Sequence, residues 1–178
     1  MDVTASAAAF DRIDQLLRDE HVVWLSSVRP DGRPHLVPIW FSWDGREILI
    51  ASKPNAQKVR NLRASAKVML ALGEAEDDFD VGLLEGHAEL LDEPAAAVLP
   101  ASHLAKYRRQ IAEIGLSAAE FHATYSQVIR IVPTRCLPWQ GRTSPRSHGR
   151  EWPVEERLAA SIRRVAASLG SAPAVAVG

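Results

Sequence analysis

The sequence predicts a single domain that is mainly β, with six strands and about three helices. Three observations support this fold class. Tight turns at Asp31-Gly32 and Asp44-Gly45 join three β-rich runs into a meander, because Asp-Gly between apolar runs is a strong hairpin signal. The middle run, 34–43, is apolar on both faces, as expected for a barrel wall that is lined inside and packed outside. The 178 residues fit one domain and suffice to bury a hydrophobic core.

The strands are predicted from short runs rich in β-branched and aromatic residues, each bounded by turn residues. The six strands are expected at 22–28, 34–43, 47–52, 67–72, 81–91 and 125–136. The helices are predicted from apolar residues at helical spacing, as with Phe10, Ile13 and Leu16. They are expected at 7–20, 55–64 and 94–111, with a further helical turn beginning within 117–122.

The composition changes near residue 142, which divides the chain into a barrel domain, 1–142, and an extension, 143–178. Residues 143–150 are rich in Ser, Arg, Pro and Gly and are predicted to be a linker. Residues 153–169 carry one apolar stripe and begin with a proline and acidic residues, which predicts a helix. A tail of small residues follows this helix.

The overall composition is that of a globular protein, with 47% apolar residues, 24% charged residues and a net charge of −1. This near-neutral charge argues against a dedicated nucleic-acid-binding protein, which usually carries an excess of basic residues. The one cysteine, Cys136, excludes an intrachain disulfide and a thiolate metal cluster, and we expect it to be buried. The six histidines are scattered without metal-ligand spacing, so no metal is expected.

Several familiar sequence signals are absent. The amino-terminal residues lack the pattern of a signal peptide, and no apolar run reaches the roughly 20 residues that cross a bilayer. We therefore expect a cytoplasmic protein. The sequence also lacks dinucleotide and phosphate-loop fingerprints, a serine-hydrolase elbow and a zinc-protease motif. Any redox chemistry therefore has to come from a bound cofactor.

The segment 51–63 concentrates chemistry at a predicted strand-to-helix junction. It contains four cations, a hydroxyl group and three amides. Backbone N–H groups at a helix start, together with nearby basic side chains, form a site for phosphate or another anion. A solvated basic helix face explains the same residues equally well. The residues alone leave these two interpretations open.

Three segments, in this order and spacing, resemble a known family. They are 26–41, which reads SSVRPDGRPHLVPIWF, then 58–63, which reads KVRNLR, and 128–135, which reads VIRIVPTR and precedes Trp139. Together they are similar to the split β-barrel flavin and deazaflavin oxidoreductases, the pyridoxamine 5'-phosphate oxidase-like proteins. The resemblance covers about residues 8–141 and is nearest to the actinobacterial branch that uses coenzyme F420.

The resemblance implies a six-stranded antiparallel split β-barrel, the FMN-binding split barrel, with flanking helices. It implies a homodimer with two cofactor sites at the interface, and F420 as the cofactor, with FMN as the alternative. The residues matched to the cofactor site are Val37, Pro38, Ile39 and Trp40 along the ring, Ser52 and Lys53 near the ring or ribityl chain, Lys58, Arg60 and Asn61 at the phosphate, and Trp139 from the partner subunit. Trp139 equally fits an aromatic residue of the dimer interface. Arg29 or Arg33 is expected to meet carboxylates of the deazaflavin tail.

The expected function is hydride transfer between the deazaflavin and a small organic acceptor, with the cofactor supplying the chemistry. No protein nucleophile is expected, and Tyr125, His35 and solvent remain candidates for a proton donor. The alternatives are an FMN-dependent reductase or oxidase on the same fold, and a non-catalytic cofactor-binding protein; haem binding is a lesser alternative. Residues 137–141 lack the Arg-Leu-x-Pro ending of true pyridoxamine-phosphate oxidases, which argues against that reaction.

Overall fold

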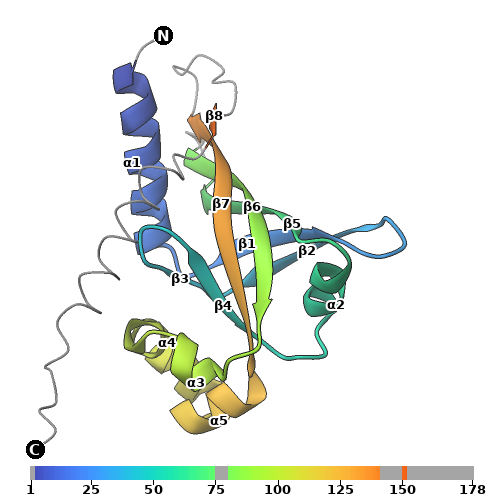
Figure 1. Cartoon of the computed structure of the whole chain (residues 1–178). Helices are drawn as coiled ribbons and strands as arrows, with labels where there is room; N and C mark the ends of the chain where they lie inside the picture. Colours follow the sequence, from blue (N-terminus) through green and yellow to red (C-terminus); the bar gives the residue numbers. More distant parts are fainter. Residues whose placement is uncertain (1–2, 75–79, 141–149, 152–178) are drawn as a thin grey trace, which may run out of the picture.

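The computed structural model describes residues 3–74, 80–140 and 150–151. One curled antiparallel sheet forms the centre of the molecule, and its strands run in the order β2-β1-β5-β6-β7-β4-β3, with β8 paired to β7 (Figure 1). The strands are β1 Val23–Val28, β2 Pro34–Ile39, β3 Ser42–Trp43, β4 Ile48–Ser52, β5 Lys67–Glu74, β6 Asp80–Leu91, β7 Gln127–Gln140 and β8 Arg150–Glu151.

Helices lie against two sides of this sheet (Figure 1). They are α1 Val3–Asp19, α2 Gln57–Ala64, α3 Ala95–Val98, α4 Ala101–Glu113 and α5 Ala118–Thr124. Helix α1 runs beside the sheet, whereas α3, α4 and α5 gather at its opposite end (Figure 1). The predicted helix at 153–169 and most of the predicted linker at 143–150 lie outside the described residues.

The predicted strand at 34–43 is in fact two strands, β2 and β3. The break falls at Trp40 and Phe41, where the backbone bonds to a side chain instead of a neighbouring strand. The Phe41 N–H donates to the Tyr107 hydroxyl at 2.9 Å, and that hydroxyl lies 2.8 Å from the Phe41 carbonyl oxygen. With β8 added, the described residues contain eight strands instead of the six predicted.

The predicted helix at 94–111 is also divided, into α3 and α4. Pro100 is the N-cap residue of α4, and Leu99 before it is extended at φ −68° and ψ 127°. A proline disfavours helical backbone at the preceding residue, which explains the break. The further helical turn predicted near 117 is α5, which begins with a capping box between Ser117 and Glu120.

The hydrophobic core has two parts. The first lies within the curled sheet and includes the inner face of α1, with Ile13, Leu17 and Leu25 fully buried. Cys136 belongs to this part at 2% exposure, which confirms the prediction that it is buried. The second part lies between the sheet and helices α3 to α5, around Tyr107 and Phe121. The helices therefore extend the barrel at one end with a core of their own.

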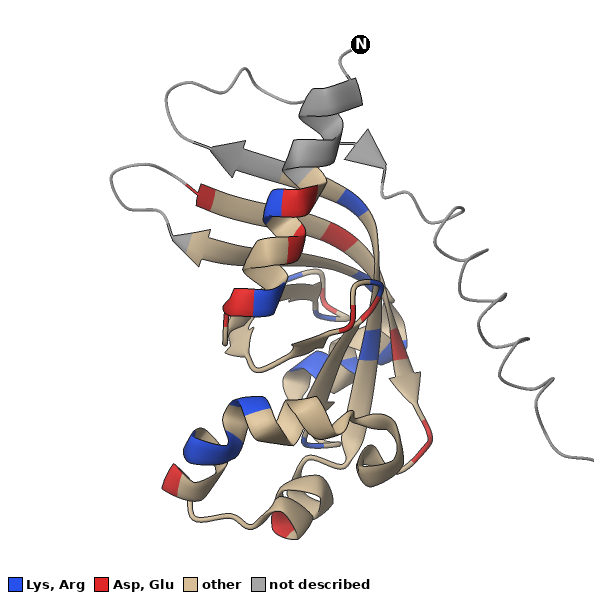
Figure 2. Ribbon diagram, turned by 90° about the vertical axis from the view of Figure 1, so that its left-hand side faces the viewer, with Lys and Arg blue, Asp and Glu red and all other residues tan. Residues whose placement is uncertain are grey.

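One ion pair joins α1 to the sheet, and another lies within the helix. Acidic and basic residues alternate along this helix (Figure 2). Arg12 pairs with Asp80 at the start of β6, and Arg18 pairs with Asp14 one helical turn away at 2.8 Å. None of the helices in the described residues is long and apolar enough to span a membrane.

Candidate functional site

The β1–β2 hairpin forms one wall of the candidate site. Its turn contains Gly32 at φ +85°, a left-handed conformation that favours glycine. Asp31 in the same turn forms an ion pair with Arg33, with 2.6 Å between Oδ2 and Nη2. The register of the two strands places Ser27 of β1 opposite His35 of β2. Both side chains belong to the alternating set that points into the curled sheet.

Helix α2 is attached to this hairpin through a buried amide. Asn61 is fully buried, and its Nδ2 donates to Ser27 Oγ at 2.9 Å. Its Oδ1 accepts a hydrogen bond from Gln57 Nε2 at 2.7 Å. A buried amide with both ends bonded avoids the cost of unpaired polar atoms, so this contact specifies where α2 lies on β1.

Arg60 closes the turn that leads from β4 into α2. Its guanidinium donates to the Asn55 carbonyl oxygen at 2.7 Å and to Gln57 Oε1 at 2.6 Å. Both acceptors precede Arg60 in the same loop and helix. Arg60 therefore shapes the start of α2, and part of its hydrogen-bonding capacity is already used.

Three basic side chains gather between the hairpin and α2, and we call Arg29, His35 and Lys58 the basic cluster. Arg29 Nε and His35 Nδ1 are buried and have no hydrogen-bond partner within the described residues. The pKa of His35 is lowered, first by burial and then by the charges of Arg29 and Lys58. Burial also lowers the pKa of Lys58. Arg29 also attracts Asp31 of the adjacent turn, but that carboxylate is paired with Arg33. Buried ring and guanidinium nitrogens without partners, beside like charges that repel one another, form a site suited to an anion.

Two further residues that were predicted to bind the cofactor, Ser52 and Lys53, lie at the end of β4 and just after it. Ser52 is buried, and its hydroxyl donates to the Lys53 carbonyl oxygen at 3.2 Å. Lys53 itself is exposed, and its Nζ lies 5.7 Å from the centre of the Tyr125 ring. Tyr125 immediately follows α5, so this contact joins the β4–α2 connection to the helical end of the molecule.

Strand β2 is an edge strand of the described sheet, paired only with β1. The Arg33 carbonyl oxygen accepts a hydrogen bond from the Arg29 N–H at 2.9 Å. Because backbone groups alternate in direction along a strand, the N–H and C=O groups of odd-numbered residues in β2 point toward β1. Pro34 and Pro38 occupy even positions, where no N–H is needed for the ladder. The backbone of Leu36 between them faces the open edge. The strand matched to the cofactor ring thus has free main-chain groups beside the basic cluster.

The sequence profile of the pyridoxamine 5'-phosphate oxidase family matches residues 9–140. The chain belongs to this family. The match spans most of the chain and every described helix and strand except β8, with α1 only in part. The prediction of a split β-barrel of the pyridoxamine 5'-phosphate oxidase type is therefore confirmed.

Solved structures agree with this assignment. An F420 reductase is 23% identical with a TM-score of 0.58, covering 69% of this chain and 94% of that one. A conserved hypothetical protein from Mycobacterium tuberculosis is 25% identical with a TM-score of 0.59, covering 83% and 91%. A FAD-binding protein from Mesorhizobium loti is 16% identical with a TM-score of 0.54, covering 76% and 92%. These likenesses support the split-barrel fold of the family.

In this family member, Trp40 packs toward the helices. Its ring stacks on Tyr107 with 5.0 Å between ring centres and an angle of 8°, and Phe121 lies 6.4 Å away. The backbone of Trp139 pairs with Val81 in the β6–β7 ladder, whereas its side chain lies outside the described part of the structure. The Trp40 side chain therefore packs in the second part of the core, away from the predicted cofactor residues in the segment 51–63.

A buried polar group near Trp40 was not predicted from the sequence. His103 is 1% exposed, and its Nδ1 lies 2.6 Å from Ser42 Oγ. Burial lowers the pKa of His103 to about 4 and raises that of Tyr107 to about 12. The i, i+4, i+8 spacing of His103, Tyr107 and Ile111 was the available signal, since it places all three on one buried face.

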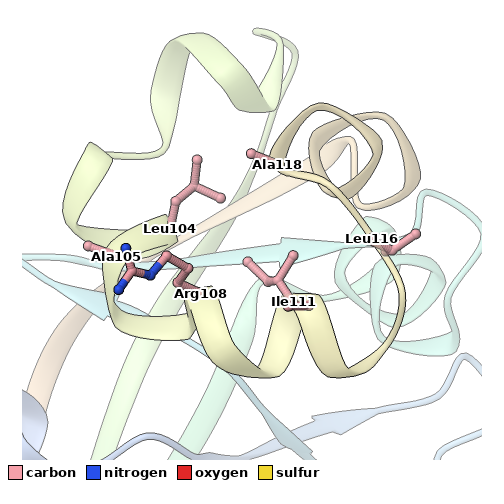
Figure 3. A pocket seen from close by; sticks show the side chains of 7 residues that line it. Leu104, Ala105, Arg108, Ile111, Leu116 and Ala118 are labelled. Atoms are coloured by element: carbon pink, nitrogen blue, oxygen red, sulfur yellow. The ribbon is translucent and has the colours of Figure 1, made fainter.

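A pocket of about 510 Å³ lies on the helical side, between α4 and α5 (Figure 3). Leu104 and Ile111 of α4 point into it, and Leu116 and Ala118 close the opposite side (Figure 3). None of the residues matched to the cofactor lines this pocket. Its lining is almost entirely aliphatic, so it lacks the converging donors of the basic cluster.

The structure brings together part of the predicted site. Lys58 joins Arg29 and His35, and Asn61 fixes the helix that carries Lys58. Sequence reasoning placed the phosphate site on 51–63, assigned Arg29 or Arg33 to the carboxylates of the deazaflavin tail, and considered His35 only as a proton donor. The alternation of residues in β2 was a sequence signal that His35 points inward. The proximity of His35 to Lys58 was not predictable, because it depends on how α2 packs against the hairpin.

Proposed function

We propose that this protein is an oxidoreductase that binds coenzyme F420 and transfers hydride between it and a small organic acceptor. The observation that carries the proposal is the basic cluster. Arg29 Nε, a donor, and His35 Nδ1 are both buried without a partner, and the half-buried Lys58 has no ion pair in the described structure. A phosphate group matches this arrangement, because its oxygens accept several charge-assisted hydrogen bonds at once. The family membership makes a phosphate-bearing flavin or deazaflavin the natural ligand.

The remaining predicted residues have distinct roles in this proposal. Lys58 and Arg29 hold the phosphate, whereas Arg60 and Asn61 fix the helix and loop that position Lys58. The ring would lie along β2 and meet Val37, Pro38 and Ile39 mainly through the backbone at the open edge, because the side chains of Val37 and Ile39 pack in the core, with Trp40 behind them. Ser52 and Lys53 line the ring or ribityl chain, and Trp139 contributes from the partner subunit.

The reduced deazaflavin, when bound, supplies the hydride. The residues of the chain bind the cofactor, orient it and exclude water from it. The proton that completes reduction of the acceptor comes from solvent or from Tyr125, whose ring lies beside the Lys53 ammonium group. No protein nucleophile takes part, in keeping with the lack of a nucleophile motif in the sequence.

We also propose that the functional unit is a homodimer. Trp24, Leu36 and Met69 are 46%, 57% and 38% exposed, although all three are large apolar residues. The register aligns them on one outer face, with Trp24 opposite Pro38 and Ser26 between Leu36 and Met69. A contiguous apolar face of this kind typically marks a protein interface, and a second copy of the chain is the proposed partner.

FMN is the second candidate cofactor, and a specific observation favours it. The basic cluster fits one phosphate group, as FMN has. The deazaflavin tail carries additional carboxylates, but Arg33, one of the two arginines expected to meet them, is already paired with Asp31. A protein that binds either cofactor without turnover is the remaining alternative.

The proposed function is tested by titrating the purified protein with F420 and with FMN, following cofactor fluorescence. We expect F420 to bind more tightly than FMN. Oxidation of reduced F420 is then followed by absorbance with a panel of quinones, enones and nitroaromatic compounds as acceptors. Tight FMN binding without F420 binding would replace the first candidate with the second. Binding of F420 without oxidation by any acceptor would favour a cofactor-binding protein.

A further inference from the structure

His35 occupies an unusual position in the basic cluster. It lies on the inner face of β2, directly opposite Ser27, and its Nδ1 is buried without a partner among the described residues. The charged groups that act on it are Arg29, from the β1–β2 turn, and Lys58, from α2. Among the described residues, no carboxylate contributes to the shift of the His35 pKa, and Asp31, in the adjacent turn, is paired with Arg33 and also attracts Arg29.

This environment favours the neutral imidazole as long as no anion is present. Two neighbouring cations and burial both oppose a positive charge on the ring. An oxyanion placed among the three groups reverses the balance, because it attracts the imidazolium form. The protonated ring also carries an N–H on both nitrogens, so its buried Nδ1 becomes a donor for the anion.

We infer that protonated His35 is a ligand of the same anion as Arg29 and Lys58, so that anion binding takes up one proton from solvent. The proton goes from water or buffer to the imidazole ring, and no bond of the anion is changed. The inference rests on the proposed function only in taking the physiological anion to be the phosphate of the cofactor. It makes cofactor affinity dependent on pH, and it assigns His35 to binding instead of to proton donation.

Two consequences distinguish this arrangement from a fixed positive charge. Anion affinity rises as the pH falls from the pKa of His35 in the anion-bound protein toward its lower pKa in the free protein, by up to about tenfold per pH unit. Between these two pKa values, each anion that binds brings a proton with it. Arg29 and Lys58 alone would give an affinity that is constant with pH in the neutral range.

Inorganic sulfate is the probe of choice, because it is a tetrahedral dianion that does not itself titrate near neutral pH. The pKa of His35 is measured by NMR titration of the histidine ring protons, with and without sodium sulfate, at constant ionic strength set with sodium chloride. We expect sulfate to raise the pKa of His35 by about one unit or more. The His35→Gln variant keeps a hydrogen-bond donor without a titrating group, and its sulfate affinity is expected to be independent of pH.

His21 provides the matched control. It is an exposed histidine before β1, at the opposite end of that strand from Arg29. His21→Gln should keep the pH dependence of sulfate binding. Sulfate binding with an unchanged pKa of His35 would overturn the inference, as would equal pH dependence in the wild-type and His35→Gln proteins.

The same measurement with F420 and FMN separates this inference from the proposed function. A raised pKa of His35 with sulfate but no binding of either cofactor would support the anion site and reject the proposed function. Cofactor binding that leaves the His35 titration unchanged would reject the inference alone. Calorimetry of cofactor binding in buffers of different ionisation enthalpy gives the number of protons taken up, which we expect to approach one between the free-state and bound-state pKa values of His35 and to vanish in His35→Gln.

Discussion

The buried His103 makes a quantitative prediction about stability and pH. Its side chain is 1% exposed, and burial is the largest cause that lowers its pKa from 6.5 to about 4. The unfolded chain therefore binds a proton at this residue more readily than the folded protein does. The stability that the neutral form provides is complete above about pH 6.5 and is lost as the pH falls toward 4.

The magnitude follows from the difference between the two pKa values. A difference of about 2.5 units corresponds to about 3 kcal/mol over the whole range. At pH 5 about 2 kcal/mol of it is already lost, because the unfolded chain is almost fully protonated there while the folded protein is not. Neighbouring cationic Lys106 and the ring of His122 act in the same direction.

The assay is urea unfolding at pH 5 and pH 7, followed by tryptophan fluorescence. The His103→Asn variant removes the titrating ring and keeps a group that hydrogen-bonds to Ser42. We expect it to be less stable than the wild type at pH 7 but to lose about 2 kcal/mol less between pH 7 and pH 5. The exposed His87 on β6 is the control, and His87→Asn should keep the wild-type pH dependence. An equal loss in the wild type and His103→Asn would refute the reasoning.

Three other predictions concern the site, the interface and the helical core. Replacing Lys58 with methionine should weaken cofactor binding about 10-fold or more, because a charge-assisted hydrogen bond is lost. The same variant should unfold at equal or higher urea concentration, since it removes a half-buried unpaired charge. Arg109→Met, at an exposed position of α4, should change neither quantity. Trp24→Asp should shift the proposed dimer to a monomer in sedimentation equilibrium, whereas Ile114→Asp, at an equally exposed apolar residue on another surface, should not. Tyr107→Phe should lower the free energy of unfolding by about 2 kcal/mol, since it leaves the Phe41 N–H without its partner, and unchanged stability would contradict the role given to this hydroxyl.

The hairpin and most strands were predictable because their signals are local. The Asp31-Gly32 turn and the alternation around it define β1 and β2 without reference to the rest of the chain. The division of the strand at Trp40 was not predictable in this way, because the backbone partner there is Tyr107, distant in sequence. Likewise, Pro100 gave a local signal for the break between α3 and α4, which the Ala-rich helical composition obscured.

The candidate site was only partly predictable for the same reason. Lys58 was recognised from its segment, whereas Arg29 and His35 come from a separate hairpin and meet it through tertiary packing. Arg60 was expected at the phosphate, but its bonds to its own loop are visible only in three dimensions. Sequence spacing identifies residues that share one helix or strand, and sites assembled across elements need the fold.

The most direct test of the account is a crystal structure of the protein with F420 bound. The account predicts the cofactor phosphate in the basic cluster, with its oxygens about 3 Å from Arg29 Nε, His35 Nδ1 and Lys58 Nζ. It also predicts the deazaflavin ring along the open edge of β2. A phosphate bound elsewhere, with the basic cluster empty or filled only by solvent, would contradict it.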